Sequence, residues 1–373
     1  MKYSKEKQIV SELLLQADIE INGKRDWDIQ ILCDSVYGRV LSQGSLGLGE
    51  TYVEGLWECK ALDQLFFKMM RADLNTKVKY NLPLILHFVK NKLFNLQTQK
   101  EVFDLKHYDI GNKLYSKMLG ATMGYTCGYW KTAKNIDDAQ IAKFELICKK
   151  IGLQKGMRIL DIGCGWGSFM KYAVENYGVS CVGITISPSQ IELGKKICQG
   201  LPIEFIFQDY RELNGTYDRI VSIGMLEAVG NKNYREYMKV VSKNLTDDGI
   251  FLLHTIGAKS SKIIDSSDPW LDKYIFPNGQ LPGAKQICEA IDNIFIIEDW
   301  HNFGADYDKT LLAWFSKFEE SWPEIKNDYD EKFYRMWKYY LLSCAGLFRA
   351  RATQLWQIVL TKNGVVGGYE SIR

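Results

Sequence analysis

Alternating helical and strand-like patterns of hydrophobic residues occupy the chain from residue 141 onward. Helix-spaced apolar positions in AKFELICKKIGL precede a strand-like MRILDIG, and SFMKYAVENYG, SCVGITIS and PSQIELGKKICQG continue the alternation. Further apolar strands are IEFIFQD, YDRIVSIG and GIFLLHTIG, with the helical YREYMKVVSKNL before the last. Alternating units of this length predict right-handed crossovers and a doubly wound, mostly parallel sheet, so the fold class is α/β.

The first part of the chain follows a different pattern. Residues 1–95 carry helix-spaced apolar positions in SELLLQADI and ALDQLFFKMM, with a turn-rich break at GSLGLGETYVEGLW. We expect a small, mainly helical domain there, a linker and active-site cover at residues 96–130, and a catalytic domain at 131–373. Near the C-terminus, DKTLLAWFSKFEESW and KFYRMWKYYLLSCAGLFRARATQLWQIVL predict long aromatic-rich helices and a terminal strand.

Composition excludes several classes of partner and site. The chain has 373 residues and a formal net charge of +2, which is too small to indicate a nucleic-acid partner. Its nine cysteines form no CxxC pair and no His/Cys cluster, so we predict neither a metal site nor disulfides, and the free thiols suit the cytoplasm. We expect no export signal. The apolar stretch at residues 82–94 is interrupted and too short to span a bilayer, so the chain can lie on a membrane but not cross it.

A glycine-rich motif, Asp161-Ile-Gly163-Cys-Gly165-Trp-Gly167, is the strongest chemical signal. It directly follows the strand MRIL and opens the helix SFMKYAVENYG, which is the context that a nucleotide-binding glycine loop requires. Glycine allows a sharp turn and a close approach to a ligand, and Asp161 can accept hydrogen bonds from an ammonium or hydroxyl group. The structural alternative is a tight strand-to-helix turn without a ligand.

The spacing argues against a dinucleotide. That fold uses GxGxxG with a ribose-binding acid about 20 residues later, whereas this chain has GxGxG preceded by an acid. After the second strand, the chain instead offers neutral hydrogen-bonding groups at a helix start, including Thr185 and Gln190, where generic methyltransferases usually place an acid. Asp209 and Tyr210 follow the next strand, at the position where an adenine would be bound.

Four polar residues lie at strand ends or in loops of this otherwise apolar unit: Cys127, Glu227, His254 and Tyr307. We expect them to converge over the carboxyl edge of the sheet. Together with HYDIGNKLY, LDIGCGWGS, YDRIVSIGMLE and FGADYDKTLLAW, they make the chain resemble the cyclopropane-fatty-acyl-phospholipid synthases and the related mycolic acid cyclopropane synthases, over essentially its whole length.

The resemblance implies a class I S-adenosylmethionine-dependent methyltransferase fold, with Rossmann-like topology, behind a lipid-contacting N-terminal domain. It also implies a bicarbonate ion in the acceptor pocket. Residues that match the family's donor site are Tyr125, Thr126, Gly163, Gly165, Thr185, Gln190, Asp209 and Tyr210, to which the motif adds Asp161. Residues that match its bicarbonate binders are Cys127, Glu227, His254, Ile256 and Tyr307. Many relatives have histidine after the glutamate, where this chain has Ala228.

The implied reaction accounts for the residue types. Attack of an alkene on a sulfonium methyl leaves a carbocation, which aromatic faces stabilise without trapping it, and a base must then take a proton for the ring to close. Aromatic candidates are Tyr125, Tyr129, Trp130 and Tyr274. Cys344, on an aromatic-rich helix, is a further candidate for lining the lipid pocket, although methyl transfer to an alkene needs no thiol.

The stretch from Lys68 to Lys100 carries seven basic residues against a single acid, Asp73, beside several large apolar residues. This pattern suits a segment that rests on anionic head groups, and an amphipathic helix with a solvated face is the alternative. We therefore expect a partner in the phospholipid bilayer, peripheral association with the inner face of the membrane, and, by the resemblance, a homodimer.

Three other functions remain open at this point. A related lipid methyltransferase would use the same donor but form methyl-branched or hydroxylated products. A small-molecule N-methyltransferase would methylate an amine without lipid. A non-catalytic lipid-binding scaffold would not bind the donor at all.

Overall fold

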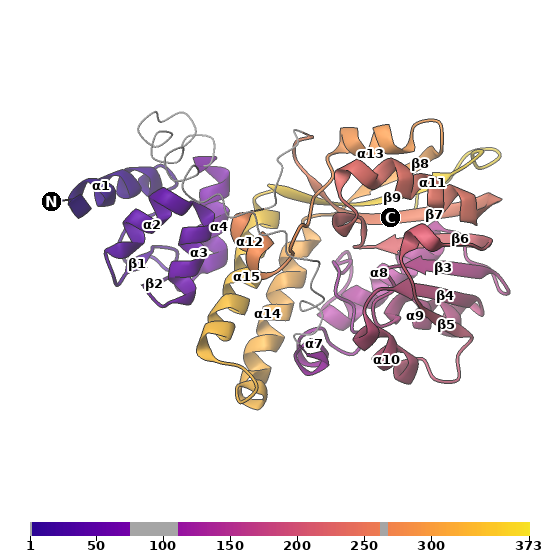
Figure 1. Cartoon of the computed structure of the whole chain (residues 1–373), viewed down its shortest axis with the longest axis horizontal. Coiled ribbons are helices and arrows are strands. Elements are labelled where there is room, and N and C mark those ends of the chain that lie inside the picture. Colours follow the sequence, from indigo (N-terminus) through magenta and orange to yellow (C-terminus); the bar gives the residue numbers. More distant parts are fainter. Residues whose placement is uncertain (1, 75–110, 262–267) are drawn as a thin grey trace. The chain divides into compact units, whose positions relative to one another are not determined.

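The alternating pattern builds one seven-stranded sheet in the computed structural model, which describes residues 2–74, 111–261 and 268–373 (Figure 1). The strand order is β5-β4-β3-β6-β7-β9-β8, and only β9 runs antiparallel to its neighbours. The predicted α/β fold with a mostly parallel sheet is confirmed. The strands are β3 (Arg158–Ile162), β4 (Ser180–Thr185), β5 (Ile203–Phe207), β6 (Tyr217–Ile223), β7 (Leu245–Ala258), β8 (Ile296–Asn302) and β9 (Thr353–Thr361).

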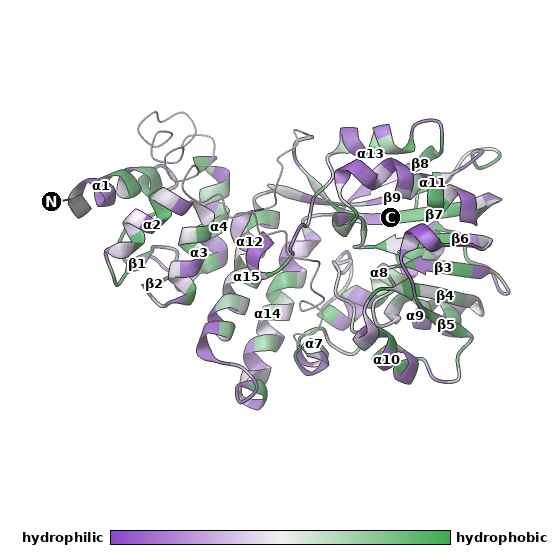
Figure 2. Cartoon of the chain, viewed as in Figure 1, coloured by the Kyte–Doolittle hydropathy of each residue, from purple (hydrophilic) through white to green (hydrophobic). Residues whose placement is uncertain are grey.

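Hydrophobic cores cover both faces of this sheet, which explains why its strands are almost continuously apolar. Successive residues alternate between the two cores: Ile159 packs with one and Leu160 with the other. Figure 2 shows the strands largely in the hydrophobic colour and the outer helices mixed. The helices of this unit are α7 (Asn112–Met118), α8 (Ile136–Lys150), α9 (Ser168–Tyr177), α10 (Pro188–Ile197), α11 (Tyr234–Asn244), α13 (Ala284–Ile291) and the first part of α14 (Asp306–Ile325).

The order of the strands places the site. The chain runs from β3 outward to β4 and β5, then returns to add β6 and β7 on the other side of β3. Loops that leave the carboxyl ends of β3 and β6 therefore run in opposite directions, and open α/β sheets commonly bind their ligands at such a point. The glycine motif follows β3, and Glu227 lies in the 3-10 turn η3 (Leu226–Ala228) after β6.

A second unit contains the N-terminal region together with residues 266–277 and 319–352. These two segments fall within the expected catalytic domain, so the continuous division predicted from the sequence differs from the observed one. They join because aromatic rings complete a core that short helices cannot build alone: Tyr339 lies 5.2 Å from Phe66 and 4.5 Å from Trp270, between ring centroids. The unit contains α1 (Lys2–Leu15), α2 (Ser35–Gln43), α3 (Ser45–Val53), α4 (Leu62–Arg71), α12 (Pro269–Tyr274), α15 (Glu331–Arg349) and the short strands β1 (Gln30–Ile31) and β2 (Trp57–Glu58).

The turn-rich break expected at GSLGLGETYVEGLW is wrong, because α3 occupies most of it. Its glycines serve packing rather than turning. A Cβ atom at Gly49 would overlap the Trp270 indole ring, and one at Gly47 would overlap the Arg39 carbonyl of α2. Close tertiary contact therefore selects glycine here, against its poor helix propensity.

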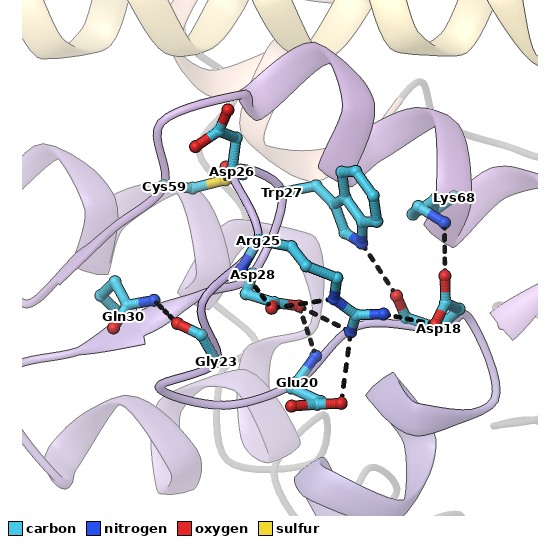
Figure 3. Close-up of polar contacts among 10 residues, drawn as sticks. All are labelled: Asp18, Glu20, Gly23, Arg25, Asp26, Trp27, Asp28, Gln30, Cys59 and Lys68. Atoms are coloured by element: carbon cyan, nitrogen blue, oxygen red, sulfur yellow. Dashed lines mark hydrogen bonds and ion pairs between the residues drawn. The ribbon is translucent and has the colours of Figure 1, made fainter.

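Lys68, the first residue of the expected basic membrane segment, has a local partner. Its ammonium group lies 2.7 Å from the Asp18 carboxylate, in a polar cluster where Arg25 also bonds the buried Asp28 (Figure 3). The charge of Lys68 is thus compensated within this unit. The basic residues at 77–100 lie outside the described residues, as do residues 96–110 of the expected linker. In the described ranges, no helix combines the length and hydrophobicity needed to span a bilayer.

We predict that Gly49→Ala lowers the free energy of unfolding by about 1–3 kcal/mol, because the added methyl group overpacks against Trp270. Gly38→Ala in α2 is the matched control, since its methyl group would meet only the flexible Glu6 carboxylate, at 3.3 Å. Urea unfolding followed by circular dichroism measures both variants. Equal destabilisation by the two substitutions would contradict the packing argument.

Candidate active site

The glycine loop between β3 and α9 makes the sharp turn that its sequence predicts. Gly163 and Gly165 have φ angles of 83° and 56°, in the left-handed region that favours glycine. The loop is tied to the end of β4 by hydrogen bonds from the Gly163 and Cys164 amides to the Ile184 carbonyl, at 3.0 and 3.1 Å. A Cβ atom at Gly163 would lie 2.8 Å from Met225, so the loop packs directly against the chain that leaves β6.

Asp161, at the end of β3, is buried and incompletely bonded. Its Oδ1 atom has no hydrogen-bond partner in the described structure. Burial raises the pKa of its carboxyl group to about 7, and the nearby positive charge of Lys143 opposes that rise. A buried, unpartnered carboxylate oxygen beside a glycine loop fits the ammonium group of a bound amino-acid moiety, such as that of S-adenosylmethionine.

Thr185 and Gln190 meet directly at the end of β4. The Thr185 hydroxyl group donates to the Gln190 side-chain oxygen at 2.9 Å. The Ser187 side chain caps α10 by accepting from the backbone N–H of Gln190. The neutral polar groups expected at this helix start are therefore ordered together. They present hydroxyl and amide groups, but no carboxylate, beside the glycine loop.

Asp209 and Tyr210 follow β5 and have different surroundings. The Asp209 carboxylate accepts hydrogen bonds from the Arg211 amide and guanidinium group, at 2.7–2.9 Å, which lowers its pKa. The Tyr210 ring is buried 5.1 Å from that of Tyr237. A ligand that bonds to Asp209 shares this carboxylate with Arg211, a partner that the sequence pattern did not reveal.

Thr126 and Cys127 lie over the carboxyl end of β6. A Cβ atom at Gly224 would lie 2.7 Å from the Thr126 methyl group, so the segment sits closely on the strand end. The Cys127 thiol is buried and lies 3.3 Å from the Gly128 carbonyl oxygen, to which it donates. Burial raises its pKa well above the usual value, so Cys127 stays a neutral thiol rather than a nucleophilic thiolate.

Glu227, His254 and Ile256 come from neighbouring elements: Glu227 lies in the turn after β6, and His254 and Ile256 lie on β7, which pairs with β6. The Glu227 Oε1 atom accepts from the Ile256 amide at 2.6 Å, and the His254 carbonyl accepts from the Gly224 amide at 2.9 Å. The Glu227 Oε2 and His254 Nε2 atoms are both buried and without a partner in the described residues. Buried polar atoms are normally satisfied, so these two, which are among twelve such atoms in the described residues, are candidates for contact with a ligand.

The ionisation and tautomer of these two residues follow from their surroundings. Burial raises the pKa of Glu227, and it lowers the pKa of His254 well below its usual value, with Lys143 and Lys150 adding to the decrease. The Gln357 side-chain nitrogen lies 3.3 Å from His254 Nδ1. With the Gln357 nitrogen donating to Nδ1, the hydrogen of the neutral imidazole lies on Nε2; this tautomer follows from the orientation assigned to the Gln357 amide.

Aromatic rings connect the remaining predicted residues. Tyr125 lies 5.1 Å from Tyr115 and 5.3 Å from Trp314, and Trp314 lies 6.3 Å from Tyr307, between ring centroids. Tyr307 is thereby linked to Tyr125 through a residue that the sequence did not single out.

The other aromatic candidates have separate surroundings. Tyr129 packs 5.3 Å from Phe303, which in turn lies 5.9 Å from His254. Trp130 donates its indole N–H to Thr310 at 2.9 Å. Tyr274 belongs to the other unit, where its hydroxyl group donates to Glu50 at 3.0 Å.

Cys344 also belongs to the other unit, on α15. Burial raises the pKa of its thiol to about 12, so it remains protonated at neutral pH.

Two residues of α8, Gln140 and Lys143, were missed from the sequence. The Lys143 ammonium group donates to the Thr126 hydroxyl group at 2.7 Å and to the Gln140 side-chain oxygen at 2.5 Å. Both side chains are buried, at 0 and 1% exposure. Their spacing of three residues, on the same face as Phe144 and Ile147, was the available signal, because polar residues within an apolar helix stripe need buried partners.

Comparisons with known proteins agree with this geometry. The profile of the family described as "Mycolic acid cyclopropane synthetase" matches residues 96–358. The cyclopropane-fatty-acyl-phospholipid synthase of Escherichia coli strain K12 is 50% identical over 98% of this chain and 96% of its own length. The sphingolipid C9-methyltransferase A of Emericella nidulans is 29% identical over 84% of this chain and 64% of its own length. The structure of mycolic acid cyclopropane synthase CmaA1 with SAH and CTAB is 31% identical and has a TM-score of 0.64, covering 69% of this chain and 96% of CmaA1.

The sheet order, the glycine loop after its first strand and the SAH-bound relative define a class I S-adenosylmethionine-dependent methyltransferase. The match to the family profile and to the E. coli enzyme narrows this class further. The chain belongs to the mycolic acid cyclopropane synthetase family.

We predict that S-adenosylhomocysteine binds about tenfold more weakly at pH 6 than at pH 8. The pKa of Asp161 is about 7, so its carboxylate is present above that pH and is largely protonated below it, where it no longer accepts from the ligand's ammonium group. Titration calorimetry between pH 6 and 8.5 measures the affinity. Asp161→Asn should bind weakly at every pH, whereas Asp218→Asn, remote at the start of β6, should retain the wild-type profile. A pH dependence that survives in Asp161→Asn would contradict the assignment.

Proposed function

We propose that the chain transfers a methylene group from S-adenosylmethionine to the cis double bond of unsaturated acyl chains in membrane phospholipids, forming a cyclopropane ring. The main support for this proposal is the 50% identity to the E. coli cyclopropane-fatty-acyl-phospholipid synthase. This similarity also extends over the N-terminal region that precedes the part matched by the family profile. The donor would lie at the glycine loop, bonded by Asp161 and by the residues that follow β4 and β5. The acceptor double bond would lie beside Tyr125 and Cys127.

The chemistry of this reaction matches the neutral character of the acceptor side. A new bond between the donor's methyl carbon and one alkene carbon leaves positive charge on the other alkene carbon, and loss of one proton allows the ring to close. Cys127 and His254 are both held neutral by burial, as their pKa shifts indicate. The π-face of Tyr125, held between Tyr115 and Trp314, is suited to the passing positive charge.

The unpartnered atoms of Glu227 and His254 fit a small oxyanion that also carries a hydroxyl group. The His254 Nε2–H can donate to such an ion, and the Glu227 carboxylate can accept from its hydroxyl group. Ile256 orients Glu227 through its amide, and we propose that Cys127 and Tyr307 complete the lining. A bicarbonate ion bound there would supply the base that the ring closure needs.

Access to the lipid requires contact with a bilayer, for which we propose the basic and apolar residues between 77 and 100. Lys68, the first basic residue of the stretch, is paired with Asp18 within its own unit. We further propose peripheral association with the cytoplasmic face of the membrane, and a homodimer whose two lipid-contacting domains bind the surface with avidity.

A second candidate is transfer of a methyl group to give a branched lipid. The similarity to a sphingolipid C9-methyltransferase over 84% of this chain favours it, since that relative is named for methylation at a carbon atom. The two candidates share the donor site and differ in the fate of the double bond after transfer.

The product distinguishes them. Full-length protein incubated with labelled S-adenosylmethionine and vesicles of unsaturated phospholipid should give fatty acids heavier by one CH2 unit that take up no hydrogen on catalytic reduction. A methylene branch has the same mass but takes up hydrogen. Mass spectrometry before and after reduction makes the measurement. Products that are all reducible would support the branched lipid, and unchanged lipids would refute both candidates.

We predict that Glu227→Gln lowers kcat about a hundredfold or more, the usual range for losing a proton-transfer step, while S-adenosylhomocysteine affinity stays nearly the same. The amide cannot replace the carboxylate as a double acceptor from Ile256 and the bound ion. Glu145→Gln is the control, because the partners of Glu145 among the described residues are Tyr172, Tyr177 and Lys149, which are not part of the proposed site. Full turnover by Glu227→Gln would remove this residue from the mechanism.

A further inference from the structure

Lys143 is a buried cation that the proposed chemistry does not use. The α8 helix buries two lysines, and the other one, Lys150, has a carboxylate partner in Asp299 at 3.4 Å. Within the described parts of the chain, Lys143 forms no ion pair and donates only to the neutral oxygens of Thr126 and Gln140. Burial of an ammonium group without a carboxylate partner is costly and lowers the pKa of Lys143 to about 7, so the retention of a lysine at this position calls for a role.

Its hydrogen bonds close a triangle. Lys143 donates to the Thr126 hydroxyl group at 2.7 Å and to the Gln140 side-chain oxygen at 2.5 Å. The Gln140 side-chain nitrogen donates in turn to the Thr126 carbonyl oxygen at 2.7 Å. Thr126 is thus held by both its side chain and its backbone, from two residues one helical turn apart on α8.

The triangle fixes the segment that separates the two halves of the site. The Thr126 methyl group packs against Gly224, at the end of β6. A Cβ atom at Gly124 would lie 2.5 Å from the Gln140 side-chain oxygen, so Gly124 also packs closely against Gln140. Tyr125 and Cys127 flank Thr126 in the chain. A shift of Thr126 would therefore move both Tyr125 and Cys127, which the proposed function places beside the acceptor double bond.

The charge of Lys143 acts on three titratable groups, which come from three different elements. They are Cys127 in the segment before α8, Asp161 on β3 and His254 on β7. Burial keeps Cys127 and His254 neutral, as their pKa shifts show, so Asp161 is the one of these three that can carry negative charge near neutral pH. The positive charge of Lys143 lowers the pKa of Asp161 against the effect of burial.

We propose that Lys143 is a positioning residue of the methyl-donor site, which holds the 125–127 segment through Thr126 and supplies the counter-charge that keeps Asp161 ionised for the donor's ammonium group. This inference rests on the proposed function only in placing the donor at the glycine loop. It explains why the ammonium group needs no carboxylate in hydrogen-bond contact. The charge of Asp161 raises the pKa of Lys143, and the charge of Lys143 lowers the pKa of Asp161, so each charged form favours the other.

The test compares the pH at which S-adenosylhomocysteine binding is half-maximal in wild-type protein and in Lys143→Met and Lys143→Gln, by titration calorimetry between pH 6 and 9. Loss of the counter-charge should raise this midpoint by about one pH unit or more, because an opposite charge nearby shifts a carboxyl pKa by that amount. Lys143→Gln keeps a donor to Thr126 and so preserves the fold if the methionine variant does not. A merely structural role would weaken binding without moving the midpoint.

Lys150→Met is the matched control, since it removes a buried lysine from the same helix on the side of Asp299, which Arg373 still pairs. Its midpoint should equal that of the wild type. An unshifted midpoint in a folded Lys143 variant would overturn the inference and leave the proposed function intact. Wild-type protein that fails to bind S-adenosylhomocysteine at any pH would overturn the donor site itself, and the inference with it.

Discussion

Burial of polar side chains without their full set of hydrogen bonds is the constraint on which this site depends. Asp161, Glu227 and His254 each have a buried polar atom without a partner in the described residues. Such atoms cost free energy unless a ligand satisfies them. The sheet tolerates this cost because apolar cores on both of its faces fix the strand ends from which these side chains project. The fold thereby presents buried groups that a polar ligand can satisfy.

The same burial sets the chemical character of each half of the site. Around the acceptor, it keeps a thiol and an imidazole neutral, which leaves aromatic faces and fixed dipoles where positive charge would develop. Around the donor, it brings the pKa values of Asp161 and Lys143 both to about 7, so their charges depend on each other and on what binds. Burial therefore keeps the thiol and the imidazole of the acceptor side uncharged. On the donor side it produces a pair, Asp161 and Lys143, in which the charge of each group depends on that of the other.

Local patterns predicted the sheet well, because buried strands and a glycine loop each leave a signature within a few consecutive residues. Glu227 lies in the turn after β6 and accepts from the Ile256 amide on the adjacent strand β7, whereas the convergence of its side chain with that of His254 stays a prediction. Long-range packing was not predictable in this way. The glycine at position 49 of α3 is explained by the Trp270 ring that lies where its Cβ atom would be, and residues 319–352 join the N-terminal unit through rings such as Tyr339. Lys143 was missed because a lysine in a helix usually faces water, and only the structure shows the Thr126 hydroxyl group beside it.

A crystal structure of the full chain grown with S-adenosylhomocysteine and bicarbonate tests most directly whether the unpartnered atoms are ligand sites. The account predicts the ligand's ammonium group within hydrogen-bond distance of Asp161 Oδ1, and density for a small planar ion that contacts both Glu227 Oε2 and His254 Nε2. Density for the nucleoside product elsewhere, or ordered side chains of the protein itself satisfying these atoms, would contradict it.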